Sequence, residues 1–197
     1  MKRLVTLFFL TSLTTLTGCE DSDPLNYKQY SNWEVTNLSG NNIAWTKFKW
    51  LNGNLGSEFY ERIGIYIPCN IDGLQHSVAF QFDLGAYLSG VYETTFSSFY
   101  ATNPELTSKI KPLNSSYKYY EDLIINFDSF SAANKSGYVY KDFGDIASTS
   151  PYDTAKIGTI GPDIFQNKVL LIDYPNKQIA ICNTLPADYA ANLVDFY

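Results

Sequence analysis

Two short apolar stretches joined by a polar turn are the feature that most constrains the fold of this chain. Residues 63–67 place isoleucine at every second position, and in residues 78–82 valine and phenylalanine alternate with alanine and glutamine. A period of two is typical of a β-strand with one buried face, and the Asn-Ile-Asp-Gly turn at 70–73 can reverse the chain between them. We predict a β-hairpin that delivers Asp83 at its end.

The remaining sequence favours the same class of structure. Aromatic residues make up 16% of the chain, with 16 tyrosines and 13 phenylalanines, and most lie in alternating stretches separated by asparagine, glycine and serine. β-Branched and aromatic residues fit a pleated, half-buried surface, and helical periodicity is rare here. The fold class is therefore predicted to be all-β.

Several further elements are predicted. Residues 43–50 indicate a strand whose phase changes between Trp45 and Phe48, as at a bulge. Gly161-Pro162 starts a short helix, because proline is favoured at the first helical position. The other expected elements are strands at 123–127 and 138–140, a hairpin formed by 169–172 and 178–182, and a terminal helix within 186–197.

The first 18 residues are typical of an export signal. Lys2 and Arg3 precede an apolar run over residues 4–16 that is too short for a permanent membrane span. The run ends in Leu16-Thr17-Gly18-Cys19, which resembles the lipobox of bacterial lipoproteins. This resemblance implies cleavage before Cys19 and a membrane anchor through a lipid on that thiol. The alternative is an ordinary cleaved signal followed by an incidental cysteine.

The predicted organisation is a signal peptide at 1–18, a lipid-anchored tether at 19–30 and one β domain at 31–197. Two of the 14 basic residues and none of the 20 acidic ones lie in 1–18, which leaves 12 basic against 20 acidic residues, a formal charge of −8. This charge argues against a nucleic-acid partner. The acidic segment at 20–24 resembles the surface-export signal of some Bacteroidota lipoproteins, so we expect the outer membrane, on its periplasmic or outer face.

Two cysteines remain after lipidation. Cys69 and Cys182 each follow an apolar, strand-like run. An oxidising compartment would allow them to form a disulfide, and two free buried thiols are the equal alternative.

The segment Phe82-Asp83-Leu84-Gly85-Ala86 is the strongest candidate for chemistry. An aspartate on a tight turn after a strand can be held in a fixed orientation, and the glycine lets backbone N–H groups approach. Two such carboxylates facing each other share a proton and can activate a water while protonating a peptide carbonyl.

From about Arg62 to Cys182 the chain resembles the retropepsin-like aspartic peptidases. The resemblance rests on the strand that leads to Asp83, on residues 157–165 with Thr159-Ile160-Gly161, and on the hairpin around Asp173. It implies an acid-protease barrel with a short helix near the C-terminal end and a flap between residues 97 and 155. The implied site residues are catalytic Asp83, the active-site loop Leu84, Gly85 and Ala86, and the supporting loop Ile160 and Gly161.

The same resemblance implies peptide or protein substrates, no metal, no organic cofactor, and a homodimer that brings two copies of Asp83 together. The family carries a hydroxyl at the position of Leu84, where leucine cannot donate a hydrogen bond. The alternative function is therefore a non-catalytic lipoprotein that keeps the fold and binds a glycan or a protein.

Other polar and aromatic residues are assigned structural roles. Asp128 is expected in a turn or strand, Asp173 in a turn, Asp163 at a helix start, and the single histidine, His76, on a solvent-facing strand. With one histidine, neither a histidine-based zinc site nor a Ser-His-Asp triad has support. The tryptophans either fill the core or form a binding face; they are Trp33, Trp45 and Trp50.

Overall fold

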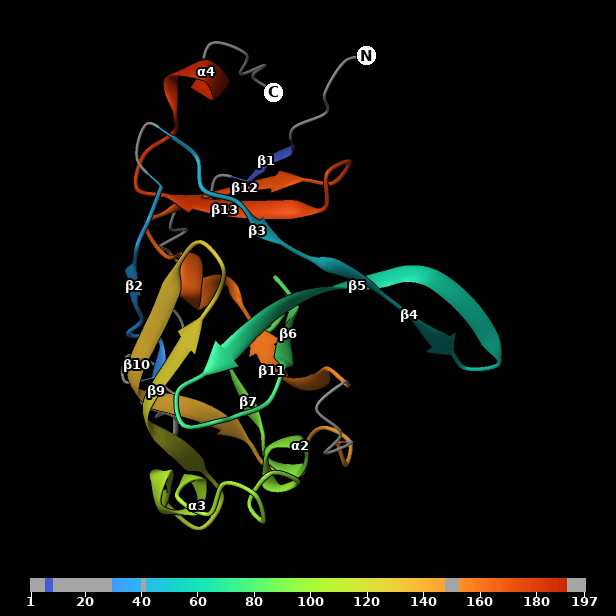
Figure 1. Ribbon diagram of the computed structural model, residues 1–197, viewed down its shortest axis with the longest axis vertical. Coiled ribbons are helices and arrows are strands. Elements are labelled where there is room, and N and C mark those ends of the chain that lie inside the picture. The colour runs from blue at the N-terminus through green and yellow to red at the C-terminus, as the bar shows by residue number, and fades with distance from the viewer. Residues whose placement is uncertain (1–5, 9–29, 40–41, 148–152, 191–197) are drawn as a thin grey trace, which may run out of the picture.

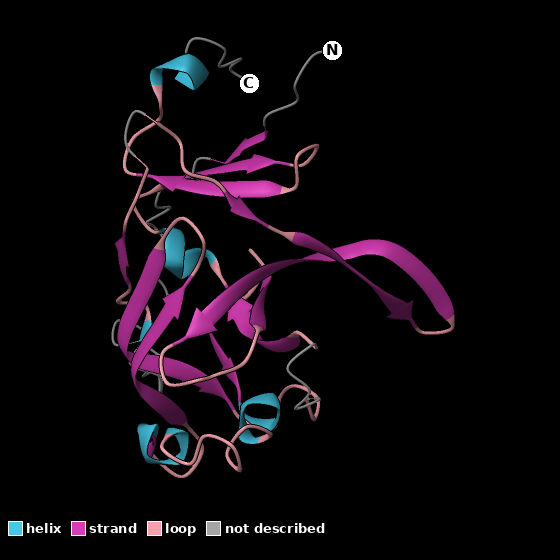
Figure 2. Cartoon of the chain, viewed as in Figure 1, coloured by secondary structure: helices cyan, strands magenta, loops and turns pink. Residues whose placement is uncertain are grey.

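The computed structural model describes residues 6–8, 30–39, 42–147 and 153–190, and this part of the chain is mostly β-structure with short helices (Figure 2). The all-β prediction is confirmed at this level. The elements are β1 Thr6–Phe8, β2 Glu34–Thr36, β3 Thr46–Lys47, β4 Lys49–Leu55, β5 Glu58–Ile71, β6 Val78–Phe82, β7 Gly90–Tyr92, α2 Glu93–Ser97, α3 Leu106–Lys109, β8 Ile110–Pro112, β9 Lys118–Asn126, β10 Ser131–Tyr140, β11 Ala155–Ile160, the 3-10 helix η1 Pro162–Phe165, β12 Val169–Asp173, β13 Gln178–Cys182 and α4 Ala187–Ala190.

The larger sheet has the strand order β2-β10-β7-β11-β6-β5-β9-β8, and β9 pairs with β10 as well as with β5. The predicted hairpin is confirmed, because β5 pairs antiparallel with β6 from Ile65 and Phe82 to Cys69 and Val78. β5 begins earlier than expected, at Glu58. Its first half forms, with β4, a two-stranded arm that projects from the rest of the molecule (Figure 1).

Strand β11 lies between β6 and β7, although these two strands follow each other in the sequence. It runs parallel to β6 and antiparallel to β7, so the loop from Asp83 to Ser89 that joins them passes over its C-terminal end. The strands meet closely at Gly158, where an added Cβ would lie 2.2 Å from the carbonyl oxygen of Gly90. Only glycine allows this approach.

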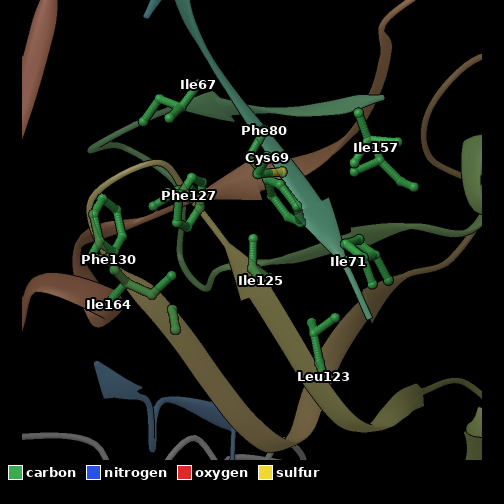
Figure 3. Close-up of a cluster of buried hydrophobic side chains, with 14 of the residues drawn as sticks. Ile67, Cys69, Ile71, Phe80, Leu123, Ile125, Phe127, Phe130, Ile157 and Ile164 are labelled. Atoms are coloured by element: carbon green, nitrogen blue, oxygen red, sulfur yellow. The ribbon is translucent and has the colours of Figure 1, made fainter. Parts of the chain in front are cut away.

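One face of the larger sheet packs into the main hydrophobic core. Ile65 and Ile67 on β5, Phe80 on β6 and Ile160 on β11 are all buried there. Figure 3 shows part of the same cluster, in which side chains from β5, β6, β9 and β11 point toward one another. Burying this much apolar surface is the main favourable contribution to the fold.

The smaller sheet has the order β1-β12-β13-β3 and lies at one end of the molecule, on the side of α4 (Figure 1). The predicted hairpin of β12 and β13 is confirmed. β1 pairs antiparallel with the outer edge of β12, from Thr6 and Ile172 to Phe8 and Leu170. A second cluster of buried residues belongs to this sheet and contains Leu171, Ala180 and Cys182.

Other predictions are corrected. The strand expected at 43–50 is divided at Phe48, because β3 joins the smaller sheet and β4 joins the larger one. The helix that begins at Pro162 is confirmed as a single 3-10 turn. Of the terminal helix, α4 spans Ala187–Ala190, and residues 191–197 lie outside the described part. Within that part, no helix combines the length and apolar character needed to cross a membrane.

Candidate functional site

The Asp83 loop is held by backbone hydrogen bonds at its start. The Asp83 N–H donates to the carbonyl oxygen of Ile160 over 2.9 Å, and Ala86 N–H donates to the Asp83 carbonyl over 3.1 Å. Gly85 N–H donates to Asp83 Oδ1 over 2.9 Å. The structure therefore brings together Asp83 and the segment at 160–161, which are distant in the sequence and which the family resemblance places in one site.

Gly161 lets the two segments approach. An added Cβ would lie 3.1 Å from the Ala86 carbonyl oxygen and 3.2 Å from Asp163 Oδ1, so a larger side chain would push the loops apart. The backbone N–H of Gly161 donates to Ser89 Oγ over 2.8 Å. Both ends of the Asp83 loop are thus attached to the segment that follows β11.

Asp163 is a central member of this network, although its sequence context predicted only a residue at a helix start. It is 5% exposed. Ser89 donates to it from its backbone N–H over 2.9 Å and from Oγ over 2.5 Å, and Trp33 Nε1 donates over 2.9 Å. Asp163 therefore connects the Asp83 loop, η1 and the segment before β2.

Burial raises the pKa of Asp163, and the hydrogen bonds from Ser89 and Trp33 oppose this rise without cancelling it. A carboxylate removed from water loses solvation that its donors replace only in part. The sequence signal for such a residue is weak, because an aspartate after Gly-Pro reads equally well as an exposed helix cap.

Asp83 also lies at the end of a polar, aromatic face of the larger sheet. Gln81 on β6 stands opposite Tyr66 on β5 and Thr159 on β11, and Thr159 stands opposite Gly90. These positions share the face that points away from the core, because the period of two places alternate residues there. Asp83 follows Gln81 by two residues.

The same face continues onto β7 and β10. Tyr140 pairs with Tyr92, and the ring centroids of these residues lie 5.9 Å apart. Tyr138 and Tyr140 have their centroids 4.7 Å apart. We call Tyr66, Tyr92, Tyr138 and Tyr140 the tyrosine face.

Two tyrosines of this face interact with the Asp83 loop. Tyr140 OH donates to the carbonyl oxygen of Leu88 over 2.6 Å. Burial raises the pKa of Tyr92; a hydrogen bond with Thr159 opposes the rise, and the negative charge of Asp83 adds to it. The tyrosine face therefore supports the loop and provides a polar aromatic surface beside the carboxylate.

Leu84 is half-buried and packs against the main core, so its side chain attaches the Asp83 loop to that core. Tyr87, which no sequence motif singled out, is 57% exposed on the same loop. Its position could have been suspected only from its closeness to Asp83 in the sequence.

The remaining candidates have structural positions. Asp128 is exposed in the bend between β9 and β10, and Asp173, the last residue of β12, accepts hydrogen bonds from the Asn176 backbone and side chain in the turn that follows. His76 is not on a strand; it lies in the connection before β6, half-buried, with its ring 4.9 Å from that of Phe99.

Cys69 and Cys182 are free, buried thiols, and burial raises the pKa of each. Cys19 lies outside the described residues.

The tryptophans are half-buried and fill space at the edges of the core. Trp33 and Trp50 pack against the main cluster, whereas Trp45 packs against the smaller one. Trp50 stacks on Tyr174 with an interplanar angle of 6°. They do not form one common binding face.

Two surface pockets are formed by described residues. One, of about 330 Å³, lies beside Cys69 and Asp128. The other, of about 440 Å³, lies between the β4–β5 arm, α2, residues 145–147 and β11. Asp83 lines neither of them. Within the described part of the protein, no cluster of three or more histidine, cysteine, aspartate or glutamate side chains could hold a metal ion.

No protein-family model matches this chain, and a search of curated proteins finds no match.

Proposed function

We propose that this chain is a lipid-anchored aspartic endopeptidase with a retropepsin-like fold that acts as a homodimer. The observation that carries the proposal is the position of Asp83 on a loop between β6 and β7, with β11 inserted between these strands and Ile160 and Gly161 packed beside the loop. The pairing of β9 with both β5 and β10 supports a barrel, and η1 follows the supporting segment as the resemblance implies.

In this proposal, the twofold axis of the dimer places two Asp83 carboxylates on either side of one water. One carboxylate is ionised and takes a proton from the water, while the other is protonated and donates to the carbonyl oxygen of the substrate. The water oxygen bonds to the carbonyl carbon, which gives a tetrahedral intermediate. The C–N bond then breaks as the first carboxyl group passes the proton that it took from water to the amide nitrogen, which leaves as an amine, and the hydroxyl on the former carbonyl oxygen returns its proton to the second carboxylate. A shared proton is required because two adjacent carboxylates do not both ionise.

Leu84 stands where the family carries a hydroxyl, so the Asp83 loop must be held by other contacts. A leucine cannot bond across the dimer axis as a hydroxyl does. Its side chain packs on the core instead, and the bonds from Asp83 N–H to Ile160 and from Tyr140 OH to Leu88 fix the loop within each copy. Contacts within one protomer, without a hydrogen bond across the dimer axis, would then orient the Asp83 carboxylate.

For a flap, the interval between residues 97 and 155 offers the β8–β9 hairpin and the segment 143–147. The second of these is the better candidate, because Phe143 has its ring centroid 6.0 Å from that of Tyr92 on the tyrosine face.

A second candidate function is binding without catalysis. It is favoured by the hydrogen bond from Gly85 N–H to Asp83 Oδ1. An aspartate that accepts a hydrogen bond from the backbone of its own turn has a structural role there, with or without a catalytic one. The tyrosine face would then contact a glycan or a partner protein.

The deciding experiment is cleavage of a broad peptide library from acidic to neutral pH by the full-length protein, purified from membranes in detergent. Asp83→Asn tests the carboxylate, and Asp128→Asn is the matched control at an exposed turn. Cleavage that survives in the control and is lost in Asp83→Asn supports the peptidase. Absence of cleavage by a folded protein at concentrations where sedimentation shows dimers would favour binding.

A further inference from the structure

The arm formed by β4 and the first half of β5, residues 49–64, projects from the molecule and exposes large apolar side chains (Figure 1). Phe59 is 64% exposed, and Tyr60 and Ile63 are exposed as well. A two-stranded ribbon is only marginally stable by itself, and exposed apolar side chains that gather on one element mark a contact with a partner. The arm is therefore a candidate interaction surface.

One edge of the arm is open. β5 pairs with β4 along one edge, and it pairs with β6 along the other edge only from Ile65 onward. In the described part of the chain, no strand pairs with this second edge at residues 58–64. The N–H and C=O groups of an open edge can pair with a further strand. At roughly 3.4 Å per residue the edge is roughly 20 Å long, the length of an ordinary strand.

The shape of the arm is fixed at a bulge. Arg62 has a φ of 61°, and its N–H donates to Asn52 Oδ1 over 2.9 Å. Its Cζ lies 5.8 Å from the centroid of the Trp50 ring, a cation–π contact that uses the face of the guanidinium group rather than its N–H donors. The arm is thus formed before a partner arrives, which lowers the entropy cost of binding.

The charges of the arm are balanced. It contains two basic and two acidic residues, so its formal charge is 2 − 2 = 0, whereas the whole chain carries −6. These residues are Lys49, Arg62, Glu58 and Glu61. The acidic surfaces of two copies repel each other elsewhere, and a membrane with anionic lipids would repel the glutamates near the tip of the arm. A second copy of the arm meets no net repulsion, which favours it as the partner.

One antiparallel register makes the open edge complementary to itself. When a twofold axis passes between Glu61 and Arg62, each of these residues stands opposite the other in the second copy. Tyr60 then stands opposite Ile63. Opposite charges and aromatic–β-branched pairs are both favourable across neighbouring strands. A shift of one residue in either direction would place Glu61 opposite Glu61 or Arg62 opposite Arg62, so the charges select this register.

The length of the open edge fits the same register. Phe59 falls opposite Gly64, so residues 59–64 of each copy are all paired. Pairing ends there, because Ile65 already pairs with Phe82 on this edge. The two arms together form four strands, and three or more strands are what a small sheet needs to be stable in water.

We propose that the arm is a self-association surface, in which residues 59–64 of β5 pair antiparallel with the same residues of a second copy. Ile65 stands opposite Phe82, so Gly64 is level with Asp83, and the axis lies roughly two to three residues beyond that level. Two Asp83 residues related by this axis would be roughly 17 Å apart at about 3.4 Å per residue, too far to share one water. The contact is therefore separate from a dimer that joins two Asp83 loops, and it does not rest on the proposed function.

The first test is disulfide cross-linking of the full-length protein in its native membrane. Tyr60→Cys and Ile63→Cys are coexpressed and oxidised, and each is also expressed alone. Two Tyr60→Cys copies in this register would hold their cysteines roughly 10 Å apart, beyond the limit of about 7 Å between the Cα atoms of a disulfide. We therefore expect about tenfold more cross-linked dimer from the coexpressed pair than from either variant alone. Tyr60→Cys coexpressed with Lys135→Cys is the control for random collision, since Lys135 is exposed on β10.

The second test measures the charge pairs by sedimentation of the purified full-length protein in detergent. Arg62→Glu places glutamates opposite each other twice and should weaken dimerisation about tenfold. Exchanging the two residues, Glu61→Arg with Arg62→Glu, restores opposite charges and should return the affinity to within about threefold of the wild type. Both variants lack the contact between Arg62 and Trp50, so this recovery separates pairing between copies from the stability of the arm. Lys135→Glu is the matched control for net charge.

Equal cross-linking in the coexpressed pair and the Lys135→Cys control, or a charge exchange that fails to restore dimerisation, would overturn the inference. So would a Tyr60→Cys variant that cross-links only to another protein or is labelled only from within the bilayer, because the arm would then have a different partner. A protein that forms the arm contact and cleaves no peptide would refute the peptidase alone. Peptide cleavage without the arm contact would overturn the inference and leave the peptidase standing.

Discussion

Replacing Asp163 with alanine should destabilise the protein by about 3 kcal/mol. The substitution leaves the buried Ser89 N–H and the half-buried Trp33 Nε1–H without their acceptor. An orphaned donor costs about 1–3 kcal/mol, with the lower value for Trp33 because water can reach it. The Ser89 hydroxyl can rotate, so we add nothing for it. Removing a buried carboxylate also removes its solvation penalty, which keeps the sum near the lower end of the range for buried charged networks.

Asp163→Asn should cost less, about 1–2 kcal/mol, because its oxygen can still accept from Ser89 while its NH2 group faces the Trp33 donor. Urea unfolding at neutral pH measures both values, with Asp128→Ala as the exposed control. A loss below about 1 kcal/mol in Asp163→Ala, matching the control, would refute the assignment of Asp163 as the link between the Asp83 loop and η1.

The pH dependence of the Asn penalty has a defined sign. Burial raises the folded-state pKa of Asp163 above its ordinary value of 3.8, so the folded protein binds the proton more tightly than the unfolded chain does. The contribution of Asp163 is then fully present below pH 3.8 and falls as the pH rises through the folded pKa. The penalty of Asp163→Asn should shrink from acidic to neutral pH. A penalty that grows with pH would mean that the donors outweigh burial.

Three further outcomes are expected. Tyr140→Phe removes the donor to Leu88 and should lower the free energy of unfolding in urea by about 1 kcal/mol. Because burial raises the pKa of Tyr140 to about 12, the stability that the Tyr140 hydroxyl contributes is present below pH 10 and is lost as the pH rises through about 12. The variant should therefore lose less stability than the wild type over that interval. Gly158→Ala should destabilise by about 3 kcal/mol through the clash with Gly90, whereas Gly64→Ala, whose nearest contact would be 3.5 Å, should change thermal stability little. Cys69 and Cys182 should react with a thiol reagent only after unfolding, because burial blocks access and raises the pKa of both; rapid reaction of the native protein would contradict this.

Local patterns predicted the parts of this fold that depend on local physics. The period of two marked β5 and β6, and the Gly-Pro start marked η1. The order of the strands in the larger sheet could not be predicted from local patterns. The insertion of β11 between β6 and β7 depends on the close approach of Gly158 and Gly90. The sequence alone does not indicate which neighbouring strand a glycine will contact.

The sequence nominated Asp83 as the candidate site residue, and it did not indicate the side chains that surround the Asp83 loop. Asp83, Ile160 and Gly161 were placed together through the family resemblance, and the backbone contacts agree with that placement. The network around Asp163 and the tyrosine face depend on which side chains share a surface. Tyrosine is abundant throughout this chain, so composition could not separate those beside Asp83 from those that fill edges.

The pairing of β1 with β12 has a consequence for the leader that we propose. Thr6–Phe8 lies within the segment that we propose is a cleaved leader, yet in the folded full-length protein it occupies a sheet edge. A leader taken up in this way would be withheld from the translocation and processing machinery. Cleavage before Cys19 would instead remove β1 and leave the outer edge of β12 without this partner strand.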